Sequence, residues 1–411
     1  MQRLASTVTF LVLALVAWPA AAGTWPQLGG NPQHTGYSAE DLRPPFRIKW
    51  NVQFQPERLY PAVQPVVADG RAFLGTESGN FYAISMADGA RAWKYPAEGD
   101  GPVGPILHTA AVADGRVFFA SMDGCVYALE AATGKKVWKF DSRMRTGFSA
   151  AVLLADGNLF AVNRGGTVFT LKPSDGSEVW AARLDCPLLQ SPAWNDGRLY
   201  VAGMDMRLYA LDSKTGRVLW KTEPIRGVAF KDYWPLVYRG MVIVRPMGGR
   251  EGFAFQEATG KPVDLPLPGA ICMNGALPPP CVDGEGQLVT SATNPAMGKA
   301  GWARVNVETK AVQYISTQTE GVGNSDENMT PNAAGRLIFV MHCEEGNAQY
   351  TGCYDIPSKT WTRIKAGPWL NMVTNCQGGG ASQALAVDGV LLHVSMHGLR
   401  CFVGGAADAK P

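Results

Sequence analysis

Residues that could bind a ligand or carry out chemistry are concentrated in short loop segments that recur along the chain. Aromatic side chains stand beside several of them, as in "KDYWP", and this mixture is the usual composition of a small-molecule pocket. Loop residues are also polar simply because loops are in contact with water, so the pocket is a hypothesis. The candidate ligand-binding residues are His108, Arg145, Lys231, Asp232, Trp234, Asn274, Asp326, Glu327, Asn328, Asn375 and Gln377.

One of these segments has the composition of a cation site. Asp326, Glu327 and Asn328 supply carboxylate and amide oxygens within a single loop. Oxygen ligands of this kind are preferred by Ca²⁺, and a carboxylate next to a bound cation could also act as a catalytic base.

Methionines recur at a second set of loop positions. Soft sulfur with imidazole suits Cu(I) or an electron-transfer partner. The interpretation that the sequence favours is a ring of adaptable apolar side chains, at the mouth of a channel or on a surface for a partner. The residues are Met122, Met204, Met247, Met341 and Met396, with His342, Cys343 and His397 beside two of them.

Several other functions lack their sequence signals. The 411 residues carry a net charge of +2, and only 18% of them are charged, so no basic field for nucleic acid is present. The sequence contains no G-x-S-x-G, H-E-x-x-H or phosphate-binding glycine loop, and no C-x-x-C. Hydrolase, zinc protease, nucleotide-binding and thioredoxin-type readings therefore find no support.

An internal repeat of about forty residues organises the chain. In the clearest copies a short apolar run, an Asp-Gly turn, two more apolar runs, a Thr-Gly or Asp-Gly turn and a tryptophan follow one another, and the fifth to seventh copies degrade this pattern. Gly134 and Gly216 belong to two of the Thr-Gly turns. The distance from the first turn to the tryptophan is 23 residues in four copies: Gly70 to Trp93, Gly115 to Trp138, Gly157 to Trp180 and Gly197 to Trp220.

Each repeat reads as a four-stranded antiparallel sheet. Asp-Gly closes tight hairpins because glycine tolerates positive φ, and turn residues interrupt every window before a helix of 10–12 residues could form. Sheets of this size have to stack, and they do so as the blades of a β-propeller. The hairpin signal occurs eight times, the last three near Gly284, Gly335 and Gly389. The sequence therefore predicts an all-β, eight-bladed propeller.

The two ends of the chain predict how the ring closes. The last repeat has room for only three strands, whereas "FRIKWNVQF" near the N-terminus reads as an isolated fourth strand. Its Trp50 lies 43 residues before Trp93, which is one repeat length. We therefore expect the N-terminal strand to complete the last blade and remove its free edge.

The repeat resembles the tryptophan-docking motif of the pyrroloquinoline-quinone (PQQ) propeller superfamily, and "TWPQLGGNPQHTGYS" is similar to the lead-in of such propellers. The resemblance covers essentially the whole mature chain. It implies one of two kinds of protein: quinoprotein alcohol dehydrogenases, which use PQQ with calcium, or non-catalytic BamB-like outer-membrane assembly factors. Catalytic members carry adjacent cysteines over the cofactor, and this sequence has none.

The termini and the cysteines indicate an exported protein. Residues 1–22 have the basic start, apolar run and small-residue end of a cleaved signal peptide. We expect a propeller over residues 23–405, a flexible tail over 406–411 and no lipid-anchor cysteine. Eight cysteines in an oxidising compartment suggest disulfides, and Cys272–Cys281 and Cys343–Cys353 could each close one loop, with buried free thiols as the alternative.

The sequence favours a periplasmic or secreted binding scaffold, a monomer without chemistry of its own. It would bind a protein partner or a small ligand through the loops at one mouth of the channel. The alternatives are a PQQ- and calcium-dependent oxidoreductase and an outer-membrane assembly scaffold, although the absence of a lipid-anchor cysteine argues against the latter. An enzyme requires a deep charged pocket, whereas a scaffold requires an exposed apolar patch.

Overall fold

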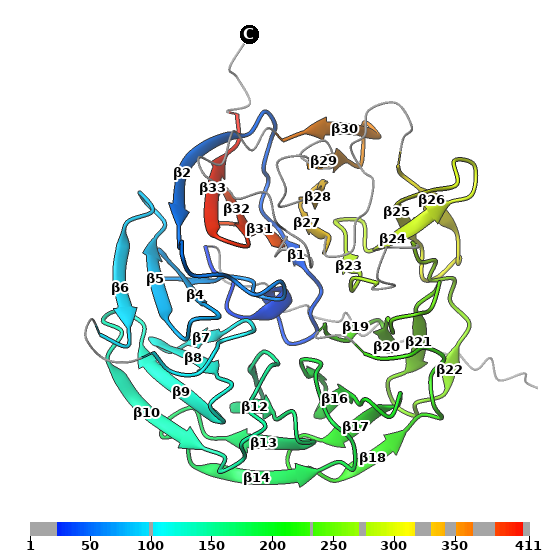
Figure 1. Ribbon diagram of the computed structural model, residues 1–411. Coiled ribbons are helices and arrows are strands. Elements are labelled where there is room, and N and C mark those ends of the chain that lie inside the picture. The colour runs from blue at the N-terminus through cyan, green and yellow to red at the C-terminus, as the bar shows by residue number, and fades with distance from the viewer. Residues whose placement is uncertain are drawn as a thin grey trace, which may run out of the picture.

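The chain forms a closed ring of eight small antiparallel sheets, arranged as blades around a central axis (Figure 1). This confirms the eight-bladed propeller that the repeat predicts. No helix in the described part of the chain is long and apolar enough to cross a membrane. The structure is a computed structural model that describes residues 23–97, 102–230, 233–270, 277–316, 330–341, 351–364 and 383–405.

The first four blades follow the predicted plan of four consecutive strands, with the first strand nearest the axis and the fourth at the rim (Figure 1). Blade 1 contains β3 (Val66–Ala68), β4 (Arg71–Gly75), β5 (Phe81–Ser85) and β6 (Arg91–Tyr95); blade 2 contains β7 (Ala111–Ala113), β8 (Arg116–Ala120), β9 (Cys125–Glu130) and β10 (Lys136–Asp141); blade 3 contains β11 (Leu153–Ala155), β12 (Asn158–Val162), β13 (Thr167–Leu171) and β14 (Glu178–Arg183); blade 4 contains β15 (Ala193–Asn195), β16 (Arg198–Ala202), β17 (Leu208–Asp212) and β18 (Val218–Lys221).

The other four blades are less regular but have the same strand order. Blade 5 contains β19 (Leu236–Tyr238), β20 (Met241–Val244), β21 (Phe253–Gln256) and β22 (Pro262–Val263); blade 6 contains β23 (Cys281–Val282), β24 (Leu288–Asn294), β25 (Lys299–Val305) and β26 (Val312–Tyr314); blade 7 contains β27 (Asn332–Ala334), β28 (Leu337–Val340), β29 (Gly352–Asp355) and β30 (Thr360–Arg363); blade 8 contains β31 (Gln383–Val387), β32 (Val390–Ser395), β33 (Gly398–Val403) and β2 (Arg47–Gln53).

Asp-Gly turns join the first and second strands of blades 1–4 and of blade 8. At Asp156 and Gly157 the φ angles are +51° and +72°, the two positive values that a type I′ hairpin requires. Because successive strands are antiparallel, these turns and the Thr-Gly turns lie on one side of the ring, which we call the hairpin face. The blade-to-blade links, and the turns between second and third strands, lie on the opposite side, the funnel face.

A tryptophan joins each regular blade to the next. The indole Nε1 of Trp138 donates a hydrogen bond of 3.0 Å to the carbonyl of Pro173, and its ring covers Gly176 so closely that a methyl group there would lie 2.6 Å from the ring. The same two contacts recur at four more interfaces: Trp50 with Met86 and Gly89, Trp93 with Ala131 and Gly134, Trp180 with Ser213 and Gly216, and Trp220 with Glu257 and Gly260.

The N-terminal strand closes the ring as predicted. β2 pairs antiparallel with β33, with Trp50 opposite Cys401. Trp50 then docks on blade 1, where its Nε1 donates to the Met86 carbonyl at 3.0 Å. The closing blade is therefore held by a strand pairing on one side and by the docking contact on the other.

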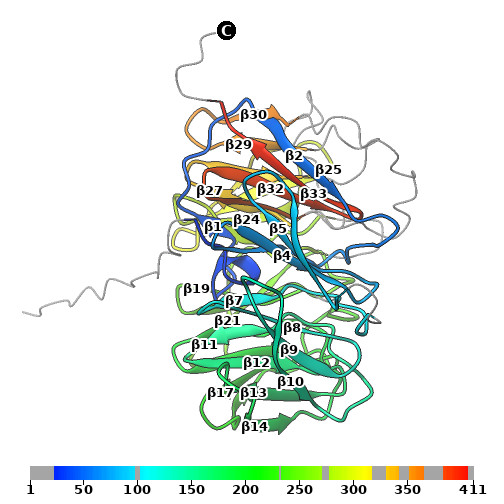
Figure 2. The same cartoon turned by 90° about the vertical axis from the view of Figure 1, so that its left-hand side faces the viewer.

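The residues before β2 form a feature that the repeat does not predict. Residues 24–40, here called the axial segment, include the short 3₁₀ turn η1 (Leu28–Gly30) and β1 (Tyr37–Ser38), and they lie across the centre of the ring (Figure 1). Seen from the side, they stay near the hairpin face, level with β7 and β19 (Figure 2). The segment hydrogen-bonds every blade in turn: Trp25 with Val67, Pro26 with Val112, Gln27 with Leu154, Pro32 with Trp194, Gln33 with Val237, Thr35 with Val282, Gly36 with Ala333, and Glu40 with Asp388.

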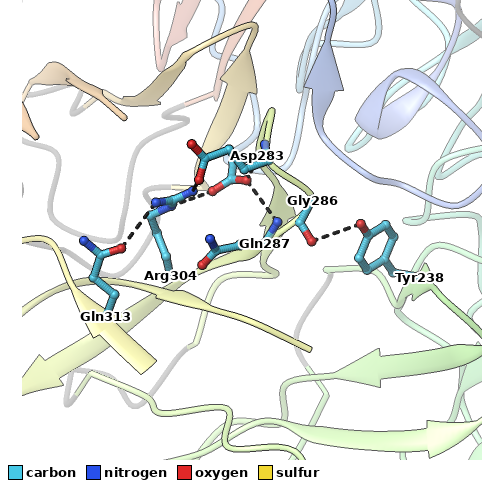
Figure 3. A network of polar contacts seen from close by, with 7 residues as sticks. Tyr238, Asp283, Gly286, Gln287, Arg304 and Gln313 are labelled. Carbon is cyan, nitrogen blue, oxygen red and sulfur yellow. Dashed lines mark hydrogen bonds and ion pairs between the residues drawn. The ribbon is translucent and has the colours of Figure 1, made fainter. Parts of the chain in front are cut away.

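Blades 5 and 6 are joined without a docking tryptophan. The Tyr238 hydroxyl donates a hydrogen bond of 3.0 Å to the carbonyl of Gly286 in the first turn of blade 6 (Figure 3). Behind that turn, the buried guanidinium of Arg304 contacts the carboxylates of Asp283 and Glu285, each at 2.7 Å. A buried ion pair is costly to break because it leaves one charge without a partner, so this network fixes the turn that receives Tyr238.

The described cysteines are buried free thiols: Cys125, Cys186, Cys281, Cys353 and Cys401. The two suggested disulfides are therefore not formed at Cys281 and Cys353, and Cys272 and Cys343 lie outside the described residues. Burial raises the pKa of Cys353 and of Cys401 to about 12. Because the thiolate is the reactive form, these thiols are structural.

The docking contact can be isolated with two glycines that share a backbone conformation. Gly157 and Gly176 have φ of +72° and +74°, but a methyl group at Gly157 meets nothing within 4 Å, whereas one at Gly176 meets Trp138. We expect Gly157→Ala to cost about 1 kcal/mol of unfolding free energy through backbone strain alone, and Gly176→Ala about 1–3 kcal/mol more through the collision. Urea unfolding of both variants measures the difference; equal losses would show that the indole does not hold the blades together.

Candidate functional site

Links and turns of neighbouring blades contact one another on the funnel face. The amide of Phe148 donates to the Ser121 carbonyl at 3.1 Å, and the amide of Met204 donates to the Pro187 carbonyl at 3.0 Å. The face is therefore a continuous loop surface rather than a set of separate tips, at least over the regular blades.

The three candidate residues in the described part of the chain do not form one cluster. His108 and Trp234 are buried near the axis, whereas Arg145 is exposed on the link between blades 2 and 3. The other eight lie outside the described residues: Lys231, Asp232, Asn274, Asp326, Glu327, Asn328, Asn375 and Gln377.

His108 and Trp234 meet across the axis. Their ring centroids are 6.1 Å apart in an edge-to-face arrangement, and His34 of the axial segment lies 6.3 Å from the same indole. Because blades 2 and 5 are not neighbours in the ring, this contact can only be made through the centre. Leu28 packs there with Tyr233 and Trp234, so side chains of the chain itself occupy the axis.

His108 also forms a hydrogen bond with Ser191 that invites comparison with a catalytic dyad. His108 Nδ1 accepts a hydrogen bond of 2.9 Å from the Thr109 amide, so the ring carries its hydrogen on Nε2. Nε2 therefore donates to Ser191 Oγ at 3.1 Å, and that oxygen also accepts from the Ala151 amide at 2.9 Å. An imidazole that donates to a serine cannot act as its general base, so the pair positions the links.

Three further link residues bring polar atoms into the interior without a hydrogen-bond partner. They are Gln64 Nε2, Ser149 Oγ and Gln190 Oε1, from residues that are at least 95% buried. The other end of the Gln64 amide accepts from Trp25 Nε1 at 2.9 Å and from the Gly29 amide at 2.8 Å, which places this side chain against the axial segment. Buried polar atoms of this kind are usually satisfied by ordered water.

His34 is held neutral at the centre of the ring. Its Nδ1 donates to the Pro235 carbonyl at 3.1 Å. Burial, reinforced by the nearby His108 and only partly offset by that hydrogen bond, lowers the pKa of His34 to about 3. The axial cluster is therefore uncharged at neutral pH.

These residues do not fit PQQ with Ca²⁺, the group that the superfamily implies. PQQ is a planar anion that needs open space and cationic partners, whereas the described axis is filled by Leu28, Tyr233 and Trp234 and its polar contacts are neutral. No group of three or more His, Cys, Asp or Glu in the described part of the chain could hold a metal ion. We therefore derive no chemical step through the cofactor.

The predicted methionine ring is divided into two parts. Met122, Met204 and Met247 are half-buried on the funnel face of blades 2, 4 and 5, whereas Met341 and Met396 are buried. His342 and Cys343 lie outside the described residues, and His397 Nδ1 donates to the Glu57 carbonyl at 3.0 Å. Met122, Met204 and Met247 therefore contribute apolar side chains to the funnel face, whereas Met341 and Met396 belong to the interior.

Sequence reasoning did not find His34, Ser191 and Gln64 among the residues around the axis. The sequence identifies the segment "WPQLGGNPQHTG" only as a lead-in. The available signals in it were the polar residues Gln27 and His34 and the two glycines, Gly29 and Gly30, that adopt positive φ. Ser191 and Gln64 occupy the same position as Trp234, two residues before the first strand of a blade. An alignment of the link segments on that position would have grouped all three.

The fold and the axis define a PQQ-type propeller with docking tryptophans. A family model described as outer membrane protein assembly factor BamB matches residues 46–187, 122–225 and 187–397, and the chain belongs to this family.

Solved structures share the fold at low sequence identity. The quinohemoprotein alcohol dehydrogenase of Comamonas testosteroni has a TM-score of 0.69 and 14% identity, covering 96% of this chain and 83% of its own. BamB of Moraxella catarrhalis has a TM-score of 0.59 and 16% identity, covering 87% and 100%. A europium-containing methanol dehydrogenase has a TM-score of 0.67 and 12% identity, covering 93% and 98%. No curated protein matches the chain.

The neutral His34 predicts an acid-sensitive axis. Its pKa is about 3 in the folded protein and about 6.5 in the unfolded chain, so the unfolded state binds more protons between these values. This contribution to stability is complete above pH 6.5 and falls as the pH is lowered, by at most about 1.4 kcal/mol per pH unit. Thermal unfolding from pH 7 to 4 should therefore show a shallower fall for His34→Asn, which keeps a donor for Pro235. Parallel curves would mean that His34 does not set the slope.

Proposed function

We propose that this protein is an exported, non-catalytic binding scaffold of the cell envelope that uses the loops of the funnel face. The observation that carries the proposal is a highly exposed apolar side chain on that face, next to the half-buried Met206 and Met247. Val228, in the link between blades 4 and 5, is 73% exposed, the highest value among the exposed large hydrophobic side chains of the described residues. A buried axis, together with an apolar side chain that is exposed beside half-buried methionines, favours partner binding over catalysis.

Val228 is held in place by its neighbours. Its amide donates to the Met247 carbonyl at 3.0 Å, and the Met247 amide donates to the Ala229 carbonyl at 2.8 Å. Gly227 lies against the Met206 methyl group and Gly248 against the Val228 side chain. A rigid apolar side chain surrounded by adaptable thioethers is a suitable centre for a protein interface.

The family description supports an assembly role at the outer membrane, because the family takes its description from an outer membrane protein assembly factor. The expected signal peptide over residues 1–22 is consistent with that location. The second candidate is a PQQ- and calcium-dependent oxidoreductase, which is favoured by the fold of the alcohol and methanol dehydrogenases. In that case Asp326, Glu327 and Asn328 are the residues expected to bind the calcium ion.

The two functions can be separated by ligand binding. We expect the melting temperature of the protein from Gly23 onward to be unchanged by PQQ, with and without Ca²⁺, because the axis is filled by its own side chains. A dye-linked alcohol oxidation assay should show no turnover. A saturable, Ca²⁺-dependent rise in melting temperature accompanied by turnover would replace the scaffold with a quinoprotein.

Partner binding can be tested directly with a photo-crosslinking amino acid placed at position 228 and, as a control, at Lys135 on the hairpin face. In cells that export the protein, position 228 should give one reproducible adduct, identified by mass spectrometry. Met247→Glu, which alters the neighbouring surface, should reduce its yield without lowering the melting temperature. Equal crosslinking yields from both positions would contradict a docking site at Val228. The same holds if Met247→Glu leaves the yield of the adduct unchanged.

A further inference from the structure

Three of the regular blades carry a carboxylate that anchors a tyrosine under the funnel face. The Tyr127 hydroxyl donates to Asp123 at 2.5 Å, and Tyr209 donates to Asp205 at 2.5 Å. In blade 1 the carboxylate comes from Glu57, which accepts from Tyr82 at 2.6 Å. These acids are part of the framework, because each one accepts the hydrogen bond of a buried tyrosine.

Blade 3 departs from this pattern. Phe169 replaces the tyrosine, and the turn reads Asn163, Arg164, Gly165, Gly166, without a carboxylate. The Asn163 side chain fixes the turn instead, since its Oδ1 accepts from Thr146 Oγ1 at 2.6 Å and from the Gly165 amide at 2.8 Å. The turn stays anchored while the charge at its tip changes from negative to positive.

The neighbouring link adds two more arginines. The Arg164 amide donates to the Gly147 carbonyl at 3.0 Å, which brings the link with the exposed Arg143 and Arg145 against the turn. The link is itself pinned to blade 2, because Ser142 Oγ donates to the Gly124 carbonyl at 2.7 Å. We call Arg143, Arg145 and Arg164 the arginine tip.

The arginine tip has no ion-pair partner among the residues that the structure describes. The Asp141 carboxylate accepts from the Arg143 amide at 2.8 Å instead. In a chain of net charge +2, three arginines on one pinned loop pair, without an ion pair to any described residue, are a local concentration of positive charge.

We propose that the arginine tip binds a carboxylate-rich segment of the partner protein. This rests on the proposed function and names the chemistry of its partner. Guanidinium groups match carboxylates in a two-pronged geometry, and exposed pairs contribute little one at a time. A segment with several carboxylates gains from contacting all three arginines, whereas a single small anion does not. Such a surface also accelerates and orients the encounter with the apolar docking at Val228.

The test measures binding of a fluorescent hexaglutamate peptide by anisotropy. The variant reverses the tip: Arg143→Glu, Arg145→Glu and Arg164→Glu. The matched control reverses three exposed lysines on the hairpin face, Lys135→Glu, Lys214→Glu and Lys261→Glu, which changes the net charge by the same amount. We expect the tip variant to lose about tenfold or more in affinity, the control to lose far less, and wild-type binding to weaken steeply with salt.

Several outcomes would overturn the proposal. Equal losses in both variants would show attraction to net charge alone. Displacement of the peptide by inorganic phosphate at equal concentration would define a small-anion site. Tip-dependent binding to vesicles that contain phosphatidylglycerol, without peptide binding, would assign the tip to the membrane. If the peptide does not bind but crosslinking from position 228 persists, the scaffold stands and the acidic partner is rejected.

Discussion

Each blade of this ring is a small sheet that cannot bury both of its faces, and the contact on which the ring depends is an indole seated on a glycine of the next blade. The contact is directional, because the tryptophan comes from the last strand of one blade and the glycine from the last turn of its successor. Its geometry sets the spacing of the blades: with glycine the indole approaches the backbone directly, and a side chain would force the two sheets apart. The 23-residue interval in the sequence therefore places the docking tryptophan at the same point of the fourth strand in each regular blade.

Docking at the rim leaves the centre to be filled by other means, and the axial segment fills it. Its hydrogen bonds reach the first strand of successive blades two residues before the hairpin turn, so it satisfies inner edges that would otherwise face an open channel. The same segment supplies Leu28 and His34 to the cluster with Trp234. A ring stabilised from its centre in this way has little room for a large axial ligand, and recognition moves to the loops of the funnel face.

The fold was predictable because it rests on local, repeated signals. Asp-Gly turns, strand-length apolar runs and tryptophans at fixed spacing each specify one contact, and Trp50 with its orphan strand even specified the closure. The site was less predictable for a physical reason. His108 and Trp234 belong to equivalent links. These links are buried, instead of lining an open funnel, because the axial segment covers them. The path of that segment depends on hydrogen bonds to eight different blades, and no local sequence pattern encodes such bonds. Arg145 lies exposed on the link between blades 2 and 3, and its role as a ligand-binding residue stays a prediction. The cysteine spacing suggested disulfides that Cys281 and Cys353 do not form.

A repeat protein contains its own internal comparison, and this helps to separate framework from function. When Asp123, Asp205 and Glu57 all accept a hydrogen bond from a tyrosine, their carboxylates are explained by the blades and need no partner. Blade 3 has Phe169 in place of the tyrosine, Gly165 in place of the aspartate, and Arg164 where blades 2 and 4 have a methionine. Asn163 anchors this turn through its own hydrogen bonds, and these contacts do not involve the Arg164 side chain. A charged side chain that takes no part in anchoring the turn, but changes the electrostatic field above the funnel face, is best explained by what the surface meets.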